Sequence, residues 1–305
     1  MNHRTLLLAS AFHAIFALQA EEIPMQTTTA AVPLTTPQTS AAEGHAQAWS
    51  GKNYSKNSAL QYNFNIKALT DYPLSGTEHI LDLGCGDGGL TAHLAALVPY
   101  GRVVGSDCSG EMIAFAQSSY APLRHNLSFT TSYVEDITYE NEFDVVTSFC
   151  MLQWVPDLSK ALANICKALK PGGRTLLFIP QVTNSPMQTE IYATVDSLKW
   201  QSFFENKRPV RSSIPLTVDF VHKLCSENKL DVTSADCSLM CYTFPNDTAY
   251  INWFKALPWI NAIPVDLQSE FCADLVARLR TYSQVTDTTC PVYINFITIK
   301  ATKPL

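Results

Sequence analysis

Short apolar runs alternate with stretches whose apolar residues recur at helical spacing, from about residue 79 to residue 180. The predicted strands are residues 79–84, 102–108, 127–134, 143–152 and 174–180. The predicted helices between them are residues 88–98, 110–120 and 157–170, the last ended by "PGG". This alternation predicts an α/β fold with a doubly wound, mostly parallel sheet covered by helices on both faces. Ligands of such sheets bind beyond the carboxyl ends of the central strands.

The pattern changes after residue 180. Residues 181–215 are helical and aromatic, and we expect an insertion there that contributes a helical lid. Strand-like residues 231–244 and 291–301 flank a predicted helix at 269–282, which suggests an antiparallel hairpin at one edge of the sheet. Six aromatic residues of this part either line an apolar chamber or pack in the core: Trp200, Phe203, Phe204, Trp253, Phe254 and Trp259.

The first 44 residues differ in composition from the rest. Residues 1–22 have a basic start, an apolar run and Ala20 before two acids, the pattern of a secretory signal peptide. His13 interrupts that run and Leu18 stands where a small residue is usual, so an N-terminal helix or disordered tail is an equal alternative. The run is too short for a stable membrane span. Residues 23–44, rich in Thr, Ala and Pro, predict a disordered linker, which leaves 45–305 as the folded domain.

The charge balance narrows the range of partners. Lys and Arg number 21 against 27 Asp and Glu, and the net charge is -6. Without a long basic run, this balance argues against a nucleic-acid partner, whose phosphates need neutralising. Lys207, Arg208 and Arg211 form a small basic group that is either a solvated face or an attractor for a polycarboxylate. The nine cysteines lack paired CxxC spacing, so neither a metal site nor a disulfide framework is predicted.

The glycine-rich loop in "HILDLGCGDGG" is the first candidate for chemistry. Its glycines fit both G-x-G-x-x-G and D-x-G-x-G-x-G, so their spacing does not identify a ligand. A dinucleotide places its pyrophosphate at the helix N-terminus and gains nothing from a carboxylate at the strand end, whereas Asp82 would face a cationic group. A ligand with an ammonium and a sulfonium therefore suits the loop. Asp107, at the end of the next strand, suits ribose hydroxyls, and Asp136 either accepts from an adenine amine or caps a turn.

Five segments resemble, in order and approximate spacing, the class I S-adenosylmethionine-dependent methyltransferases: "ILDLGCGDG", "VVGSDCSGEMI", "VEDI", "FDVVTSFCMLQWVPD" and "ALKPGG". The resemblance covers Trp49 to about Pro180 and implies a Rossmann-like, seven-stranded sheet with S-adenosylmethionine as cofactor. Residues 54–61 and 146–155 are most similar to the juvenile-hormone acid and trans-aconitate methyltransferases, which methylate a carboxylate. A branch that methylates a malonyl-carrier thioester is similar too. The fourth strand lacks the "NPPY" or "DPPY" of amino-methylating enzymes.

The resemblance also implies site residues. Gln61 and Trp154 would orient the carboxylate, because an amide N–H and an indole N–H are neutral donors. Without the resemblance, Trp154 is a core aromatic and Gln61 a solvated helix residue. The implied cofactor contacts are Tyr54, Asp82, Gly84, Gly86, Gly88, Asp107, Met112, Asp136 and Ile137. The strand end "GSDCS" departs from the bulkier apolar stretch of the family, and we expect Ser109 there as an additional contact. Tyr54 would form part of an N-terminal lid.

The implied reaction is an in-line displacement on a sulfonium. A carboxylate is already ionised at neutral pH, so no general base is needed. Catalysis then rests on aligning the oxygen and excluding water. The implied acceptor is a small-molecule or carrier-bound carboxylic acid.

Three other functions stay open at this point. One is a C- or N-methyltransferase of lipid or quinone type on the same fold. Another is an NAD-dependent oxidoreductase, against which Asp82 and "CMLQW" argue. The third is a non-catalytic secreted binding protein, because an exported enzyme would lack a donor that is made inside cells. Localisation is therefore cytoplasmic by donor availability, or secreted if the signal-like segment is genuine, and the sequence fits a monomer or a homodimer alike.

Overall fold

The computed structural model describes residues 49–181, 185–205, 216–283 and 289–305. The signal-like segment 1–22, the linker 23–44 and the basic residues Lys207, Arg208 and Arg211 lie outside the described residues. The predictions made for them therefore stay predictions.

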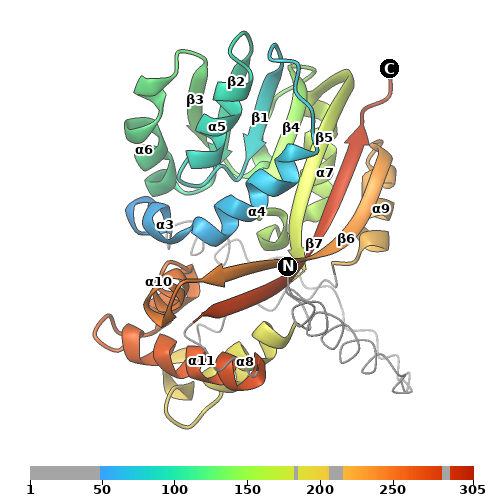
Figure 1. Cartoon of the computed structure of the whole chain (residues 1–305). Helices are drawn as coiled ribbons and strands as arrows, with labels where there is room; N and C mark the ends of the chain where they lie inside the picture. Colours follow the sequence, from blue (N-terminus) through green and yellow to red (C-terminus); the bar gives the residue numbers. More distant parts are fainter. Residues whose placement is uncertain (1–48, 182–184, 206–215, 284–288) are drawn as a thin grey trace, which may run out of the picture. The chain divides into compact units, whose positions relative to one another are not determined.

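One seven-stranded sheet forms the centre of the fold, with the strand order β3-β2-β1-β4-β5-β7-β6 (Figure 1). Neighbours β1 to β5 pair in parallel, and β7 pairs antiparallel with both β5 and β6. The strands are β1 His79–Leu83, β2 Arg102–Asp107, β3 Leu127–Thr131, β4 Phe143–Phe149, β5 Leu169–Gln181, β6 Asp231–Phe244 and β7 Cys290–Thr302. The predicted fold class, a doubly wound and mostly parallel sheet with an antiparallel pair at one edge, is confirmed.

Helices cover both faces of this sheet. One hydrophobic core lies between the sheet and α4, α5 and α6, and a second lies between the sheet and α7 and α9. The helices are α3 Gly51–Asn57, α4 Ala59–Thr70, α5 Gly89–Leu97, α6 Gly110–Ser119, α7 Leu158–Ala168, α8 Pro186–Val195, α9 Val218–Glu227, α10 Asp247–Lys255 and α11 Gln268–Ser283. Short 3-10 turns are η1 Ala121–Leu123, η2 Val134–Asp136, η3 Leu152–Trp154, η4 Gln201–Phe204 and η5 Pro258–Ala262.

Strand β1 illustrates why the central strands read as continuous apolar runs. Side chains of a strand alternate between its two faces, and both faces of this sheet are covered. Ile80 therefore packs in the first core, while Leu81 and Leu83 pack in the second, and all three are buried. The same rule makes Asp82 the exception that calls for a partner, because a buried carboxylate is costly unless it is hydrogen-bonded.

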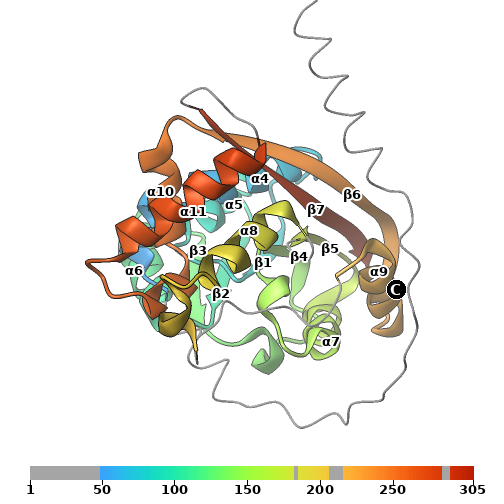
Figure 2. The same cartoon turned by 90° about the horizontal axis from the view of Figure 1, so that it is seen from below.

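The antiparallel pair β6 and β7 extends well past the end of β5. Strand β5 ends at Gln181, opposite Asn295, whereas β6 and β7 continue pairing as far as Phe244 and Cys290. This extension reaches α8, α10 and α11, which lie beyond the carboxyl ends of the parallel strands (Figures 1 and 2). The two strands are not joined by a tight turn, because α10, η5 and α11 form their connection.

We call residues 186–205 and 247–283, which contain α8, η4, α10, η5 and α11, the cap. Its interior is aromatic: Phe271 packs against Trp200 at 5.3 Å and Phe204 at 5.5 Å between ring centroids. The indole of Trp200 also donates to Asp274 at 2.9 Å. Trp200 and Phe204 are therefore core residues of the cap. Within the described ranges, no helix is long and apolar enough to cross a membrane.

Candidate active site

The loop between β1 and α5 is shaped by glycines in left-handed conformations. The φ angles are 73° at Gly84, 54° at Gly86 and 82° at Gly88. A Cβ at Gly88 would lie 2.7 Å from the Ala116 Cβ, so this glycine allows close packing against α6. At Gly86 the nearest atom to a Cβ would be a Tyr54 ring carbon at 3.9 Å, so this glycine borders open space. The loop therefore leaves room beside Gly86 while Gly88 anchors it.

Asp107 ties this loop to the end of β2. Its Oδ2 accepts from the Gly86 N–H at 2.9 Å, and its Oδ1 accepts from the Ser109 N–H at 2.9 Å. Burial raises the pKa of Asp107, although the two hydrogen bonds act to lower it. Each carboxylate oxygen keeps a second lone pair, so Asp107 can still accept from a pair of hydroxyls.

Two further carboxylates lie beside the loop. Asp82 is buried, and its two oxygens accept from the hydroxyls of Thr91 at 2.7 Å and Thr147 at 2.8 Å. Burial raises the pKa of Asp82 to about 6, because its effect is larger than the opposing effect of the two hydroxyl donors. Burial also raises the pKa of Asp87, whose Oδ1 accepts from the Gly89 N–H at 3.2 Å. One buried carboxylate, Asp82, and two half-buried ones, Asp87 and Asp107, therefore lie in one place and favour a cationic ligand.

A small cavity of about 50 Å³ lies against the loop, and we call it the loop cavity. Its lining residues are Tyr54, Ser58, Gln61, Tyr62, Asn65, Asp82, Gly84, Cys85, Gly86, Asp87, Leu90 and Phe149. None of these described residues carries a positive charge, so a cationic ligand would meet the carboxylates without a competing cationic side chain in the lining.

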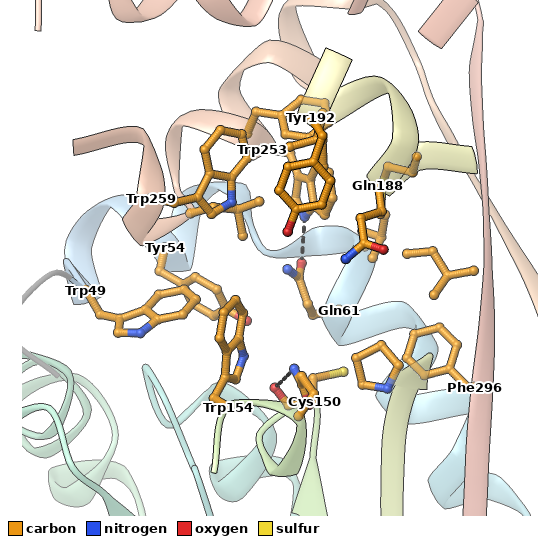
Figure 3. Close-up of a pocket in the computed structure, with 18 residues that line it drawn as sticks. Trp49, Tyr54, Gln61, Cys150, Trp154, Gln188, Tyr192, Trp253, Trp259 and Phe296 are labelled. Carbon is orange, nitrogen blue, oxygen red and sulfur yellow. Dashed lines mark hydrogen bonds between the residues drawn. The ribbon is translucent and has the colours of Figure 1, made fainter. Parts of the chain in front are cut away.

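A second cavity of about 160 Å³ lies between the carboxyl ends of β4 and β5 and the cap (Figure 3). We call it the aromatic cavity. It is lined by Trp49, Tyr54, Leu60, Gln61, Cys150, Gln153, Trp154, Pro180, Met187, Gln188, Ile191, Tyr192, Trp253, Phe254, Leu257, Trp259, Ile294 and Phe296. No Asp, Glu, Lys, Arg or His occurs among these described lining residues. Its ligand is therefore met by aromatic surface and by neutral hydrogen-bonding groups.

Tyr54 and Gln61 line both cavities. Burial raises the pKa of Tyr54 well above its usual value, and the nearby Cys150, Asp87 and Asp107 add to the shift, so the phenol stays protonated at neutral pH. The two cavities thus meet at a neutral phenol and a neutral amide.

The Gln61 amide is held by the cap. Its Oε1 accepts from the Trp253 indole N–H at 3.0 Å, which leaves the Nε2 group as its remaining donor. Figure 3 shows Gln61 and Trp154 projecting into the same space. Trp154 is 38% exposed and packs edge-on against Trp49 at 6.2 Å, and Trp49 packs in the same way against Tyr54 at 5.5 Å. These three aromatic rings line one side of the aromatic cavity.

Cys150 adds a thiol to this cavity. Its φ angle is 54°, an unusual value for a residue with a side chain, and its Sγ donates to Asn65 Oδ1 at 3.3 Å. Burial raises the pKa of Cys150 to about 12. The thiol is therefore protonated at neutral pH and acts neither as a base nor as a nucleophile.

A methyltransferase-domain family model matches residues 80–173, which span the glycine loop, Asp107 and Trp154. A trans-aconitate 2-methyltransferase of Variovorax paradoxus is 26% identical over 215 residues, which are 69% of this chain and 81% of that protein. A juvenile hormone acid O-methyltransferase of Bombyx mori is 27% identical over 244 residues, 74% and 84% of the two chains. A putative methyltransferase of Invertebrate iridescent virus 6 is 27% identical, over 52% and 58% of the two chains.

Residues 80–173 form a methyltransferase domain, and the chain is an S-adenosylmethionine-dependent methyltransferase. Solved structures share the fold of this methyltransferase. A putative methyltransferase from Bacillus halodurans has a TM-score of 0.54 at 15% identity and covers 79% of this chain and 98% of its own. A Haemonchus contortus phosphoethanolamine N-methyltransferase 2 in complex with S-adenosyl-L-methionine has a TM-score of 0.52 at 18% identity, covering 80% and 53%.

S-adenosylmethionine is the cofactor of this methyltransferase, and the loop cavity fits its cationic amino-acid end. The described lining residues include two carboxylates, Asp82 and Asp87, and no cationic side chain, and Asp107 lies beside them at the end of β2. This charge matches an ammonium and a sulfonium. Asp107 retains acceptor capacity for ribose hydroxyls. We propose these residues as the methyltransferase's donor site.

The structure brings many of the expected site residues together. Tyr54, Asp82, Gly84, Gly86 and Gln61 line the loop cavity, and Trp154 lies across the aromatic cavity from Gln61. Gly88 and Ser109 serve the local structure: Gly88 packs under α6, and the Ser109 hydroxyl caps α6 by accepting from the Met112 N–H at 3.3 Å.

The residues expected at the adenine end differ in their exposure to solvent. Met112 and Ile137 are buried, so each offers apolar surface. The Asp136 side chain is 65% exposed and pairs with Lys160 at 3.3 Å. Its neighbour Glu135 is half-buried and close enough to Cys108 to help raise the pKa of that thiol, after burial and Asp107. Either Asp136 or Glu135 is therefore a candidate acceptor for an adenine amine.

Sequence reasoning missed several lining residues. Cys150 and Gln153 belong to the same segment, "CMLQW", as Trp154. Their closeness to Trp154 in the sequence could have identified them as lining residues. Asp87 lies inside the glycine loop and was passed over for Asp82. The α8 residues that line the aromatic cavity carry no motif: Met187, Gln188, Ile191 and Tyr192.

Proposed function

We propose that this methyltransferase transfers a methyl group to the carboxylate of a small-molecule acid with an apolar body. The observation that supports this most strongly is the neutral lining of the aromatic cavity where it meets the loop cavity at Gln61. An acceptor that must lose a proton first requires a base, and the described lining offers none at neutral pH. A carboxylate requires none.

S-adenosylmethionine supplies a methyl group on a sulfonium, which a carboxylate oxygen accepts as the carbon–sulfur bond breaks and neutral S-adenosylhomocysteine is released. In this proposal the Gln61 Nε2 and Trp154 Nε1 groups donate hydrogen bonds that orient the carboxylate. Neutral donors hold the oxygen without an ion pair that would weaken it as a nucleophile. Tyr54 and Trp49 exclude water from the junction of the two cavities.

The class of acid follows from the same lining. The two relatives are named for trans-aconitate, a tricarboxylate, and for juvenile hormone acid. A second or third carboxylate in the aromatic cavity would meet no cationic partner among the described residues, and an unpaired buried charge is costly. We therefore favour a monocarboxylic acid whose body packs on the cap residues Ile191, Trp253 and Trp259.

We propose that the cap and α3 act together as a lid, which is a larger unit than the insertion at 181–215 expected from the sequence. The Asn53 Nδ2 group on α3 donates to the Lys255 carbonyl at the end of α10 at 3.0 Å, so one hydrogen bond joins the two parts. Closure of this lid over a bound acid would complete the exclusion of water.

The test is a transfer assay with methyl-labelled S-adenosylmethionine and a panel of acids matched in length. We expect octanoic and longer monocarboxylic acids to be methylated with a kcat/KM at least roughly tenfold above that of dicarboxylates and tricarboxylates. Equal or better use of a tricarboxylate would overturn the assigned acid class. Methylation of amines or phenols alone would overturn the carboxylate proposal.

A further inference from the structure

Trp253 and Gln61 are 192 positions apart in the chain, and a side-chain hydrogen bond joins them in the lining of the aromatic cavity (Figure 3). An indole N–H can only donate, so the Gln61 atom 3.0 Å from it has to be the amide oxygen. The identity of the two ends of the amide is therefore decided by Trp253. The amide Nε2 group, which can only donate, is left for a ligand at the junction of the two cavities.

We infer that Trp253 is a positioning residue that makes Gln61 a hydrogen-bond donor and thereby selects a carboxylate over a carboxamide or an amine. A carboxylate offers only acceptors and matches the Nε2 group. A carboxamide can donate hydrogen bonds from its own N–H groups. To accept one, the Gln61 amide would have to rotate and lose the hydrogen bond from Trp253. The identity of the selected group rests on the proposed function, whereas the hydrogen bond that enforces the selection does not.

Trp253 is well placed to impose an orientation, because its ring is held on several sides. Only 5% of the residue is exposed, and its ring packs against Phe254 at 4.7 Å, Phe244 at 5.8 Å and Tyr250 at 6.0 Å. The indole therefore cannot follow Gln61 if the amide rotates. Rotation would set the indole N–H against the amide NH₂ and leave a buried donor unsatisfied.

The selection can be measured by comparing two probes of the same shape, octanoic acid and octanamide. Their dissociation constants are determined with S-adenosylhomocysteine present, in the wild type and in Trp253→Phe, which keeps an aromatic ring but removes the donor. The wild type should bind the acid more tightly, and the acid-to-amide preference should fall by roughly tenfold in Trp253→Phe. An unchanged preference would overturn the inference.

Trp200→Phe is the matched control. Trp200 also donates an indole hydrogen bond inside the cap, to Asp274, but it does not line the aromatic cavity. This variant should lose stability and keep the acid-to-amide preference of the wild type. A fall in preference as large as that of Trp253→Phe would show that any loosening of the cap has the same effect, and would overturn the specific role.

A second readout needs neither substrate nor turnover. In ¹⁵N-labelled protein, Gln61→Ala should move one tryptophan indole N–H resonance and expose it to faster hydrogen exchange, while Trp253 itself stays in place. If no indole resonance changes, the inference is wrong. If this signal changes but the wild type binds neither probe, the proposed acid class has failed and the positioning role of Trp253 stands.

The double variant Gln61→Ala with Trp253→Phe separates positioning from packing. Since Trp253 acts through Gln61, adding Trp253→Phe to Gln61→Ala should change the acid-to-amide preference by less than about twofold. Two independent, additive losses would contradict the inference.

Discussion

The Asp107 carboxylate accepts the Gly86 N–H at 2.9 Å, which joins the end of β2 to the loop that follows β1. The residue expected to bind ribose therefore also shapes the loop expected to bind the methionine end. Its other oxygen holds the Ser109 N–H at the start of α6. One half-buried carboxylate thus sets the relative positions of three elements around the proposed donor site.

Asp107→Asn should weaken the binding of S-adenosylhomocysteine by at least roughly tenfold. An asparagine carbonyl can replace one of the two accepting oxygens, but its NH₂ group would face a backbone N–H and leave that donor unsatisfied. The free energy of unfolding should fall by about 1–3 kcal/mol for the same reason. Calorimetric titration and urea denaturation measure the two effects, and unchanged ligand binding would contradict the role assigned to Asp107.

Gly86 and Gly88 should respond differently to alanine. Both have positive φ angles, so either substitution strains the backbone by about 1–2 kcal/mol. Gly88→Ala would also crowd Ala116 and Phe129, for a total loss of about 2–4 kcal/mol of stability. Gly86→Ala should unfold closer to the wild type and yet bind S-adenosylhomocysteine more weakly, because its methyl group would occupy the loop cavity.

Denaturation and ligand titration of the two glycine variants side by side check this difference. The informative comparison is the ratio of lost affinity to lost stability, which should be larger for Gly86→Ala. A larger ratio for Gly88→Ala would mean that the ligand does not approach the loop beside Gly86.

The raised pKa of Asp82 predicts a pH dependence of stability without ligand. Burial lifts the pKa to about 6 from an unfolded value near 4, so the folded state holds the proton more tightly between these values. The contribution of Asp82 to stability therefore decreases as the pH rises from about 4 to about 6, by up to roughly 3 kcal/mol, and is constant above that. Urea denaturation across this range measures it, with Asp82→Asn as the control that removes the Asp82 part of the slope.

The same carboxylate predicts the opposite trend for ligand binding. A cationic ligand favours the ionised form, so S-adenosylhomocysteine, which keeps the ammonium, should bind more weakly as the pH falls below about 6. In Asp82→Asn the affinity for S-adenosylhomocysteine should fall less steeply with decreasing pH, although Asp87 and Asp107 still titrate. Calorimetry at several pH values tests this, and parallel slopes for wild type and variant would argue against a charge role for Asp82.

Gln61→Ala and Trp154→Phe should lower kcat/KM for a carboxylic acid by about tenfold to a hundredfold each. Each variant removes one neutral donor to the acceptor carboxylate, and such hydrogen bonds to a charged group contribute about 1.5–3 kcal/mol. S-adenosylhomocysteine should still bind within about threefold of wild type to Trp154→Phe, because Trp154 does not line the loop cavity. A parallel loss of S-adenosylhomocysteine affinity in Trp154→Phe would instead indicate a general distortion of the site.

The parallel half of the fold and the loop cavity could be predicted because their signals are local. Apolar runs such as that of β1 show in the sequence which residues are buried, and Asp82 and Asp107 fall at strand ends that meet at one edge of the sheet. The pairing of the two β-strands that form the edge was also predicted. The helix predicted at 269–282 in their connection is present as α11, whereas α10 and η5 were not predicted, because the aromatic residues of that segment show no clear period.

The aromatic cavity could be predicted only in part, because its walls come from distant segments. Of the six aromatic residues singled out, three line it: Trp253, Phe254 and Trp259. Trp200 and Phe204 fill the interior of the cap, and Phe203, partly buried, packs against Trp200 at 6.1 Å. No periodicity separates these two groups, since both are apolar and helical. The orientation of the Gln61 amide depends on a partner 192 positions away, and the exposed pair of Asp136 with Lys160 depends on the position of α7.

The most direct test of the account is the chemical fate of the transferred methyl group. The methyltransferase is incubated with methyl-labelled S-adenosylmethionine and octanoic acid, with octylamine and octanamide as matched acceptors, and the products are treated with mild base. We expect label to pass to the acid alone and base to release it as methanol, the mark of a methyl ester. Label that resists base, or transfer to the amine with none to the acid, would contradict it.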